Sequence, residues 1–439
     1  LEYRYEESGK KNLMSVEALT GKATPYTKPQ EIEPEIKGAI NITLSPDKKF
    51  AAYTKPDHNL YITDLSTNKE TALTSDGSDV ILNGYASWIY YEEILGRASQ
   101  YKAFWWSPDS KQLAYMRFDD SQVPVFPIYV ADGQHGYLEN THYPKAGDKN
   151  PQVKLGIVSV AAGSTVWADF DATKDQYFGT PAWSPSNELL VQWMNRGQNE
   201  LIVYTVNSSK GNKKEIYKET QPTWIVLDNE RFSFLKESKQ FILASDKDGW
   251  ENLYLYDMNG KLINQITKGN YWGTSVLHID EKNKFVYIQA RKENSARFDI
   301  YKVSLSGKIV NRLSSGNYSY DFPSVSPGGK YIIAAYSNLE TPPVIGLLNN
   351  SGKQVREILN TKGKEFDNYF IPKTKLITVK SADGLFDLPV TITYPLNFDS
   401  TKKYPVWISV YGGPNAGTVY DRWKPVGGVT QLFAKDGVV

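Results

Sequence analysis

Two adjacent acids, Glu92 and Glu93, are the residues of this chain best placed to do chemistry. They stand in a run of bulky side chains that includes Trp88, Tyr90 and Ile94. Carboxylates that lose their water in such surroundings are costly unless a cation neutralises them. The free α-ammonium of a peptide would supply that cation, because its pKa of about 8 leaves it largely charged at neutral pH. The pair therefore suggests a site that grips peptides by their N-terminus.

The backbone decides whether both acids can reach one ligand. Adjacent residues of a regular strand point to opposite faces of its sheet. Residues 90–97 are therefore expected to form a short helical turn or an irregular insertion. The alternative is an ordinary surface pair, in which the acids are salt-bridged to Arg97 or Lys102.

The acid pair lies in a chain of repeated turns and strands. One phrase is a tight turn of the Ser-Pro-Asp type that feeds an apolar strand, because Pro presets φ and Asp or Gly accepts the reversal. It begins at Ser45, Ser107 and Ser184 and recurs in variant forms further along. A second phrase is an alternating strand, a small-residue turn and another strand. It begins near Asn12, Asn59, Val153, Glu200, Asn252, Asp299 and Pro343.

The spacing of the second phrase predicts the fold. Most copies are about 45–50 residues apart, the size of one four-stranded propeller blade. We count seven copies, and the first has no upstream turn phrase, so seven blades is a lower bound for the predicted all-β propeller. The interval from Asn59 to Val153 is roughly twice the usual one, so that blade carries an insertion that holds the acid pair. The alternative is a β-sandwich of unrelated hairpins.

The pattern changes after residue 370. Residues 376–379, 388–394 and 406–411 are continuous apolar runs, which are expected in a sheet buried on both faces, as in an α/β domain. The chain stops at a turn that leads into another predicted strand. We therefore expect a domain that begins near residue 371 and continues beyond Val439, and residues that precede Leu1 in the complete protein.

Composition excludes several classes of protein. Among 439 residues, Lys and Arg number 50 and Asp and Glu number 49, which argues against a nucleic-acid binder. No apolar run approaches the roughly 18 residues that a membrane span needs. Cysteine is absent, so disulfides, a thiol nucleophile and a zinc–thiolate site are excluded. Asp119 and Asp120 have no third metal ligand at suitable spacing and are interpreted as solvated turn acids.

These features together resemble the dipeptidyl peptidase IV family of the prolyl oligopeptidase clan. The resemblance extends over the whole chain and is strong because its motifs occur in the family's order and spacing. They are the segment from Trp88 to Glu93, Trp105-Trp106-Ser107-Pro108-Asp109, the segment from Asp119 to Pro124, Tyr143-Pro144-Lys145-Ala146-Gly147, Lys402-Lys403-Tyr404-Pro405 and Val410-Tyr411-Gly412-Gly413-Pro414.

The resemblance implies a fold and an activity. It implies an eight-bladed propeller, here residues 1–370, and the beginning of an α/β-hydrolase domain in residues 371–439. Members of the family release dipeptides, with Pro or Ala favoured at the second position, from peptides with a free N-terminus. Glu92 and Glu93 match the double glutamate that binds the α-amino group. Tyr411 matches the tyrosine of the oxyanion hole, although a core tyrosine before a Gly-Gly-Pro turn is the alternative.

The nucleophile is missing from this sequence. A hydrolase of this clan needs a G-x-S-x-G elbow followed by Asp and then His. No such elbow occurs, and the four histidines, His58, His135, His142 and His278, all lie in the expected propeller. We therefore expect the catalytic triad beyond Val439 and no hydrolysis by this chain alone. No cofactor or metal is expected.

The resemblance also implies partners and a location. The segment from Tyr143 to Pro151 resembles the arm through which family members form homodimers, and an ordinary surface loop is the alternative. A periplasmic, extracellular or cell-surface location is expected, with no membrane span in this chain. Two other functions stay open: a prolyl tripeptidyl or other aminopeptidase of the same clan, and a non-catalytic binding propeller.

Overall fold

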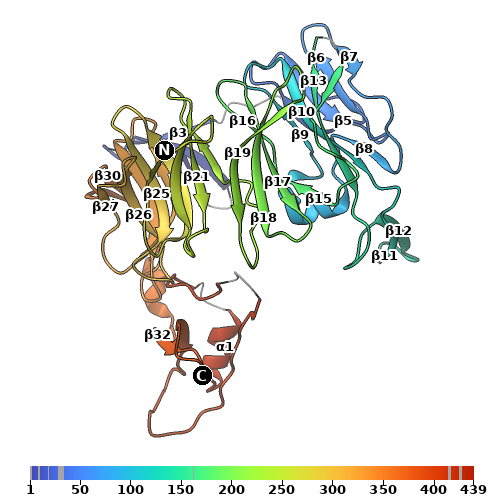
Figure 1. Cartoon of the computed structure of the whole chain (residues 1–439). Coiled ribbons are helices and arrows are strands. Elements are labelled where there is room, and N and C mark those ends of the chain that lie inside the picture. The colour runs from blue at the N-terminus through green and yellow to red at the C-terminus, as the bar shows by residue number, and fades with distance from the viewer. Residues whose placement is uncertain are drawn as a thin grey trace. The chain divides into compact units, whose positions relative to one another are not determined.

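The computed structural model describes residues 2–7, 10–17, 19–27, 34–161, 163–413, 417–424 and 428–439. Strands dominate the described chain, and its helical segments are short (Figure 1). These segments are η1 (Tyr90–Ile94), η2 (Arg97–Ser99), η3 (Lys364–Asn368) and α1 (Val429–Lys435). The chain forms two compact units. The central unit comprises Gln30–Leu243 and Tyr256–Ile263, and the terminal unit comprises Leu1–Pro29, Ala244–Leu255 and Asn264–Val439.

The central unit holds three large antiparallel sheets and a separate hairpin. The sheet orders are β4-β5-β6-β7, β14-β13-β10-β8 with β9 on β10, and β15-β17-β18-β19 with β16 on β17, and the hairpin is β11-β12. The strands are β4 (Ile40–Leu44), β5 (Phe50–Thr54), β6 (Leu60–Asp64), β7 (Lys69–Ala72), β8 (Ile81–Asn83), β9 (Phe104–Trp106), β10 (Gln112–Asp119), β11 (Val125–Val130), β12 (Tyr137–His142), β13 (Gln152–Ser159), β14 (Thr165–Trp167), β15 (Gln176–Phe178), β16 (Ala182–Trp183), β17 (Leu189–Asn195), β18 (Glu200–Val206) and β19 (Lys213–Thr220).

The terminal unit is also built from antiparallel sheets. Their orders are β1-β2-β3, β24-β25-β26-β27, β28-β29-β30-β31 and β32-β33, and a further sheet, β20-β21-β22-β23, has residues in both units. The strands are β1 (Glu2–Glu7), β2 (Lys10–Val16), β3 (Ala23–Pro25), β20 (Phe232–Phe234), β21 (Gln240–Ser245), β22 (Asn252–Asp257), β23 (Leu262–Gln265), β24 (Trp272–Asp280), β25 (Phe285–Arg291), β26 (Asp299–Ser304), β27 (Val310–Arg312), β28 (Ser319–Val325), β29 (Tyr331–Ser337), β30 (Val344–Asn349), β31 (Gln354–Asn360), β32 (Thr374–Lys380) and β33 (Asp387–Thr393).

The repeated phrases correspond to successive sheets. In most sheets consecutive strands pair in sequence order, which is the up-and-down pattern of a meander. Each copy of the second phrase lies in a different sheet, on strands β2, β6, β13, β18, β22, β26 and β30. The predicted repeat of strands is therefore present in the described chain. The predicted number of propeller blades stays a prediction.

The inner strands are more buried than their sequence alternation predicts. In β10 only the two ends and Arg117 are partly exposed, and β17 begins with four consecutive buried residues. Side chains from β10, β13, β17 and β18 share one hydrophobic cluster. A strand covered by packing on both faces has no solvent side, so the expected alternation is lost.

A glycine joint recurs between neighbouring sheets. In four sheets the turn before the last strand carries a glycine with positive φ, at which a side chain would clash with the backbone of the preceding sheet. An added Cβ at Gly260 would lie 2.3 Å from the Ile216 carbonyl oxygen, and one at Gly352 would lie 2.3 Å from that of Leu313. The same relation holds for Gly211 with Trp167 and for Gly307 with Gln265. In these four sheets the small-residue turn of the second phrase is therefore a packing requirement.

Two expectations for the C-terminal segment were wrong. Residues 376–379 fall on β32 and residues 388–393 fall on β33, as predicted. However, Val379 is 45% and Leu388 is 47% exposed, so this antiparallel hairpin is not buried on both faces. Residues 406–411 form no strand. The Trp407 N–H donates to the Val439 carbonyl (2.8 Å), and the Val439 N–H donates to the Pro405 carbonyl (3.0 Å). This single pair of bonds is too short to make a ladder.

Candidate functional site

The acid pair lies on a helical turn, as the sequence predicts. η1 is π-helical, and the Leu95 N–H donates to the Tyr90 carbonyl (2.7 Å). Successive residues of such a turn are roughly a quarter of a turn apart, whereas those of a strand are half a turn apart. Glu92 and Glu93 can therefore serve one ligand from one side of the segment. Single π-helical turns of this kind occur frequently at functional sites.

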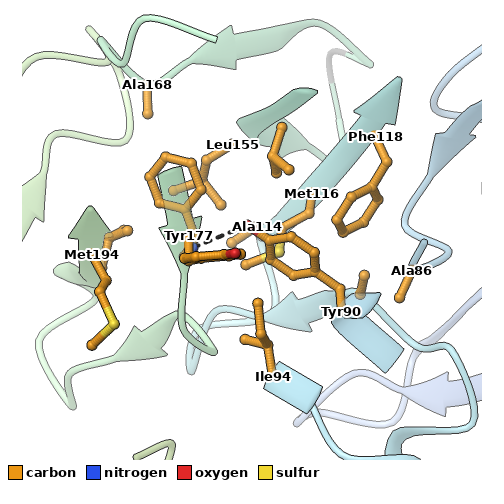
Figure 2. Close-up of a cluster of buried hydrophobic side chains, with 14 of the residues drawn as sticks. Ala86, Tyr90, Ile94, Ala114, Met116, Phe118, Leu155, Ala168, Tyr177 and Met194 are labelled. Atoms are coloured by element: carbon orange, nitrogen blue, oxygen red, sulfur yellow. Dashed lines mark hydrogen bonds between the residues drawn. The ribbon is translucent and has the colours of Figure 1, made fainter. Parts of the chain in front are cut away.

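The apolar side of η1 attaches it to the core. Tyr90 and Ile94 are buried, and Figure 2 shows both pointing into a cluster with Met116 and Phe118. The Tyr90 and Phe118 rings are 4.9 Å apart, and the Phe178 N–H donates to the Tyr90 hydroxyl (3.1 Å). Buried anchors of this kind restrict the movement of the turn. The two carboxylates are thus carried on a rigid support.

Glu92 already has partners for both of its oxygens. The Trp88 Nε1–H donates to Oε2 (2.7 Å), and Arg97 forms an ion pair with Oε1. The Arg97 hydrogen bond lowers the pKa of Glu92. The surface-pair alternative is therefore realised in part, through Arg97. Lys102 forms no ion pair with either acid in the described chain, and burial lowers its pKa.

Glu93 is the open member of the pair. Its side chain is exposed, and it has no hydrogen bond or ion pair with any described residue. An exposed carboxylate beside a paired one can accept hydrogen bonds from an incoming cation without first losing a protein partner. Glu93 is therefore the carboxylate of the pair that can accept hydrogen bonds from a ligand without an exchange of partners.

Aromatic rings stand beside the acids. Tyr91 stacks on Tyr101 with ring centres 3.7 Å apart, and Tyr101 stacks on Tyr85 at 4.9 Å. Trp88 meets the edge of Tyr143 at 6.0 Å. Sequence reasoning missed Tyr85, Tyr101 and Tyr143 as neighbours of the site, because they come from different segments. The density of tyrosines around the acid pair was the only available signal.

Asp120 is not the solvated turn acid that the sequence suggested. It is 3% exposed, and its N–H donates to the Val80 carbonyl (2.8 Å). Burial raises the pKa of Asp120 to about 6, an increase that nearby His142 partly offsets.

The segment predicted to be a dimerisation arm, Tyr143 to Pro151, comes directly after the β11–β12 hairpin. The β11–β12 hairpin projects exposed apolar side chains, with Tyr129 (64% exposed) directly opposite Leu138 (60%). The predicted segment from Tyr143 to Pro151 follows the hairpin and is tied to the body. The Asn150 amide, for example, donates to the Tyr177 hydroxyl (2.9 Å). The exposed apolar surface thus precedes the predicted segment.

Tyr411 lies in the terminal unit, so it is described apart from the acid pair. It is 70% exposed and lies outside regular secondary structure. Pro414 of its motif lies outside the described residues. A cavity of about 760 Å³ lies in the same unit and includes the neighbouring residue Val410 in its wall. Other residues of that wall are Trp250, Trp272, Arg291, Lys292 and Thr391.

Three comparisons place the chain among known proteins. A family model described as the dipeptidyl peptidase IV (DPP IV) N-terminal region matches residues 1–343. Dipeptidyl peptidase 4 of Trichophyton equinum is 30% identical over 87% of this chain and 50% of its own length. That of Trichophyton rubrum is 29% identical over 96% of this chain and 55% of its own length. The crystal structure of Porphyromonas gingivalis dipeptidyl peptidase 4 aligns with a TM-score of 0.82 and 27% identity, over 100% of this chain and 60% of that one.

These alignments cover most of this chain but a smaller share of each relative. The chain spans about half the length of the curated relatives that it matches. No helix within the described ranges has the length and apolar character needed to cross a membrane.

Proposed function

This chain belongs to the dipeptidyl peptidase IV family, and we propose that it is the substrate-binding part of a serine exopeptidase that releases dipeptides from free peptide N-termini. The carrying observation is the acid pair on η1. One carboxylate is held by the Trp88 indole, and the other is exposed and unpaired in the described chain. Ionised carboxylates make short, strong hydrogen bonds to an ammonium group.

The acid pair would fix which peptide bond is cleaved. A ligand held by its N-terminal ammonium places a fixed number of residues between that anchor and the nucleophile. Release of a dipeptide, rather than a tripeptide, then depends on the distance from the acids to the catalytic serine. A prolyl tripeptidyl peptidase of the same clan would share the anchor. Cleavage of matched di- and tripeptide reporters by the full-length enzyme separates these two activities.

We assign Tyr411 to the oxyanion hole of the full-length enzyme. A tyrosine O–H can donate to the alkoxide that develops in the tetrahedral intermediate. The exposed Tyr411 side chain leaves its hydroxyl available for this role. The Ser, Asp and His of the triad would come from sequence beyond Val439.

The proposed domain division is residues 1–370 for the propeller and 371–439 for the start of an α/β-hydrolase domain. The bonds of Val439 to Pro405 and Trp407 have the pattern of a parallel bridge, in which one residue bonds to both neighbours of its partner. Helix α1 lies between these two segments in the sequence. Two parallel strands joined through a helix are the unit from which α/β domains are built.

We further propose a homodimer and an exported enzyme. The exposed apolar face of the β11–β12 hairpin supports the dimer, because burial of exposed apolar surface stabilises an association. The periplasmic or extracellular location rests on the family resemblance alone.

Substitution of each acid tests the proposed function. Glu92→Gln or Glu93→Gln in the full-length enzyme should lower kcat/KM for free-amine dipeptide reporters by roughly 10²–10³-fold, because a charge-assisted contact is lost. Glu340→Gln, an exposed acid outside η1, is the matched control. N-acetylated reporters should be poor substrates of every variant. Unchanged kcat/KM in both acid variants would contradict the assignment.

A further inference from the structure

The ligand-free chain already holds a cation on one of its two acids. Arg97 lies on η2, directly after the acid-bearing turn, and its Nη2 pairs with Glu92 Oε1. Its side chain is 70% exposed, and this ion pair is the one carboxylate contact that the described structure gives it. The guanidinium therefore stands where a ligand ammonium would approach Glu92.

The strength of this pair decides whether a ligand could displace it. The pair is open to water mainly on the arginine side, since the Arg97 side chain is 70% exposed and the Glu92 side chain is 22% exposed. Ion pairs that water can reach are weak, because water solvates the charges and ordering a long side chain costs entropy. Displacement of Arg97 should therefore cost a ligand roughly 2–5-fold in affinity. The arginine would regain hydration, since most of its surface faces water.

The two oxygens of Glu92 have different kinds of partner, one neutral and one charged. Trp88 holds Oε2 with a neutral indole N–H, which can stay in place when a ligand binds. Arg97 holds Oε1 with a full positive charge, which competes with any second cation. Glu93 offers a nearby contact that needs no exchange.

We propose that Arg97 is a resident counter-ion that the peptide ammonium displaces from Glu92 when it binds. In the empty site, Arg97 keeps Glu92 ionised and oriented. Because a ligand must replace this arginine, the acid pair binds cations less tightly than two free carboxylates would. This inference rests on the proposed function of the acid pair. Removal of Arg97 should therefore strengthen ammonium binding, whereas an arginine that shaped the site would weaken binding when removed.

The Trp88 indole N–H provides a direct readout because it is hydrogen bonded to Glu92. The chain labelled with ¹⁵N-tryptophan would be titrated with glycyl-prolinamide and with its N-acetyl form, and the Trp88 indole signal assigned with Trp88→Phe. Arg97→Gln should tighten glycyl-prolinamide binding by roughly 2–5-fold at low salt. The gain should shrink as salt is added, because screening weakens exposed charges.

Three further variants isolate the effect. Arg97→Lys keeps a cation and should bind like the native chain. Arg196→Gln removes another surface arginine, one paired with Asp175, and should change nothing. In a Glu92→Gln background, Arg97→Gln should give no gain, since the exchange needs both partners.

The outcomes separate the two proposals. If the Glu92→Gln and Glu93→Gln variants lose binding but Arg97→Gln binds no tighter than the native chain, the counter-ion inference is overturned and the amine site stands. If the acid variants bind as well as the native chain, or if glycyl-prolinamide binds to no variant, the amine site itself is overturned, and the inference falls with it.

Discussion

At the scale of single residues, Trp88 does more than line the site. Its indole N–H holds one oxygen of Glu92, and its ring packs against the edge of Tyr143. One side chain thus connects the acid pair to the segment that follows the β11–β12 hairpin. Ligand binding at the acids and movement of the hairpin would both change the contacts of this tryptophan.

Asp120 gives a prediction about stability and pH. Because burial raises its pKa from 3.8 to about 6, the folded state holds this proton more tightly than the unfolded state does. The resulting stabilisation is fully present below pH 3.8 and is lost as the pH rises through about 6, a change of up to about 3 kcal/mol. Asp120→Asn should therefore flatten the pH dependence of the free energy of unfolding between pH 4 and 7.

Urea denaturation at a series of pH values measures this effect. Asp119→Asn, which replaces the less buried neighbour, serves as the control. A native-like slope in Asp120→Asn would show that Asp120 does not carry the dependence.

The sequence predicted the acid pair better than its surroundings. The position of Glu92 and Glu93 and their helical turn followed from residue type and from the geometry of neighbouring side chains. The burial of Asp120 and the contact of Trp88 with Tyr143 did not follow, because both depend on segments that meet only in the folded chain.

At the scale of elements, the glycine joint leads to a second prediction. Gly260→Ala would place a Cβ 2.3 Å from the Ile216 carbonyl at a φ of 89°, so both packing and backbone conformation oppose it. We expect a loss of roughly 2–4 kcal/mol in the free energy of unfolding, from overpacking and the left-handed backbone together.

Gly133→Ala is the matched control. Gly133 also has a positive φ, of 63°, but an added Cβ there has no neighbour within 4 Å. It should cost about 1 kcal/mol, the backbone contribution alone. Equal losses in the two variants, measured by urea denaturation, would mean that the inter-sheet contact contributes nothing.

Strand spacing predicted the elements well in the repeated part of the chain and less well after it. Each second phrase supplied a strand of its own sheet, since turn chemistry and strand length repeat together. Residues 406–411 have the composition of a buried strand, but a strand also needs a partner ladder. In the described chain only Val439 pairs with this run, so composition alone gave the wrong element.

At the scale of the whole molecule, the exposed face of the β11–β12 hairpin allows the proposed homodimer to be tested. Leu138→Glu would place a charge on the exposed apolar face, opposite Tyr129, and should shift the protein from dimer to monomer. Sedimentation velocity at micromolar protein measures this shift. Leu262→Glu, on an exposed residue of β23, is the control and should sediment like the native protein. A Leu138→Glu protein that stays dimeric would exclude this face from the interface.

The glycine joint also bears on how such a chain can arise. In the four sheets that contain Gly211, Gly260, Gly307 and Gly352, the small turn fits against the backbone of the preceding sheet. A gene segment that encodes one repeat can therefore be copied in tandem, and the new copy meets its neighbours through contacts it already encodes. Tandem duplication can then lengthen the array by whole repeats, while the side chains on its surface are free to vary. The segment that bears Glu92 and Glu93 lies between β8 and β9, away from these four turns.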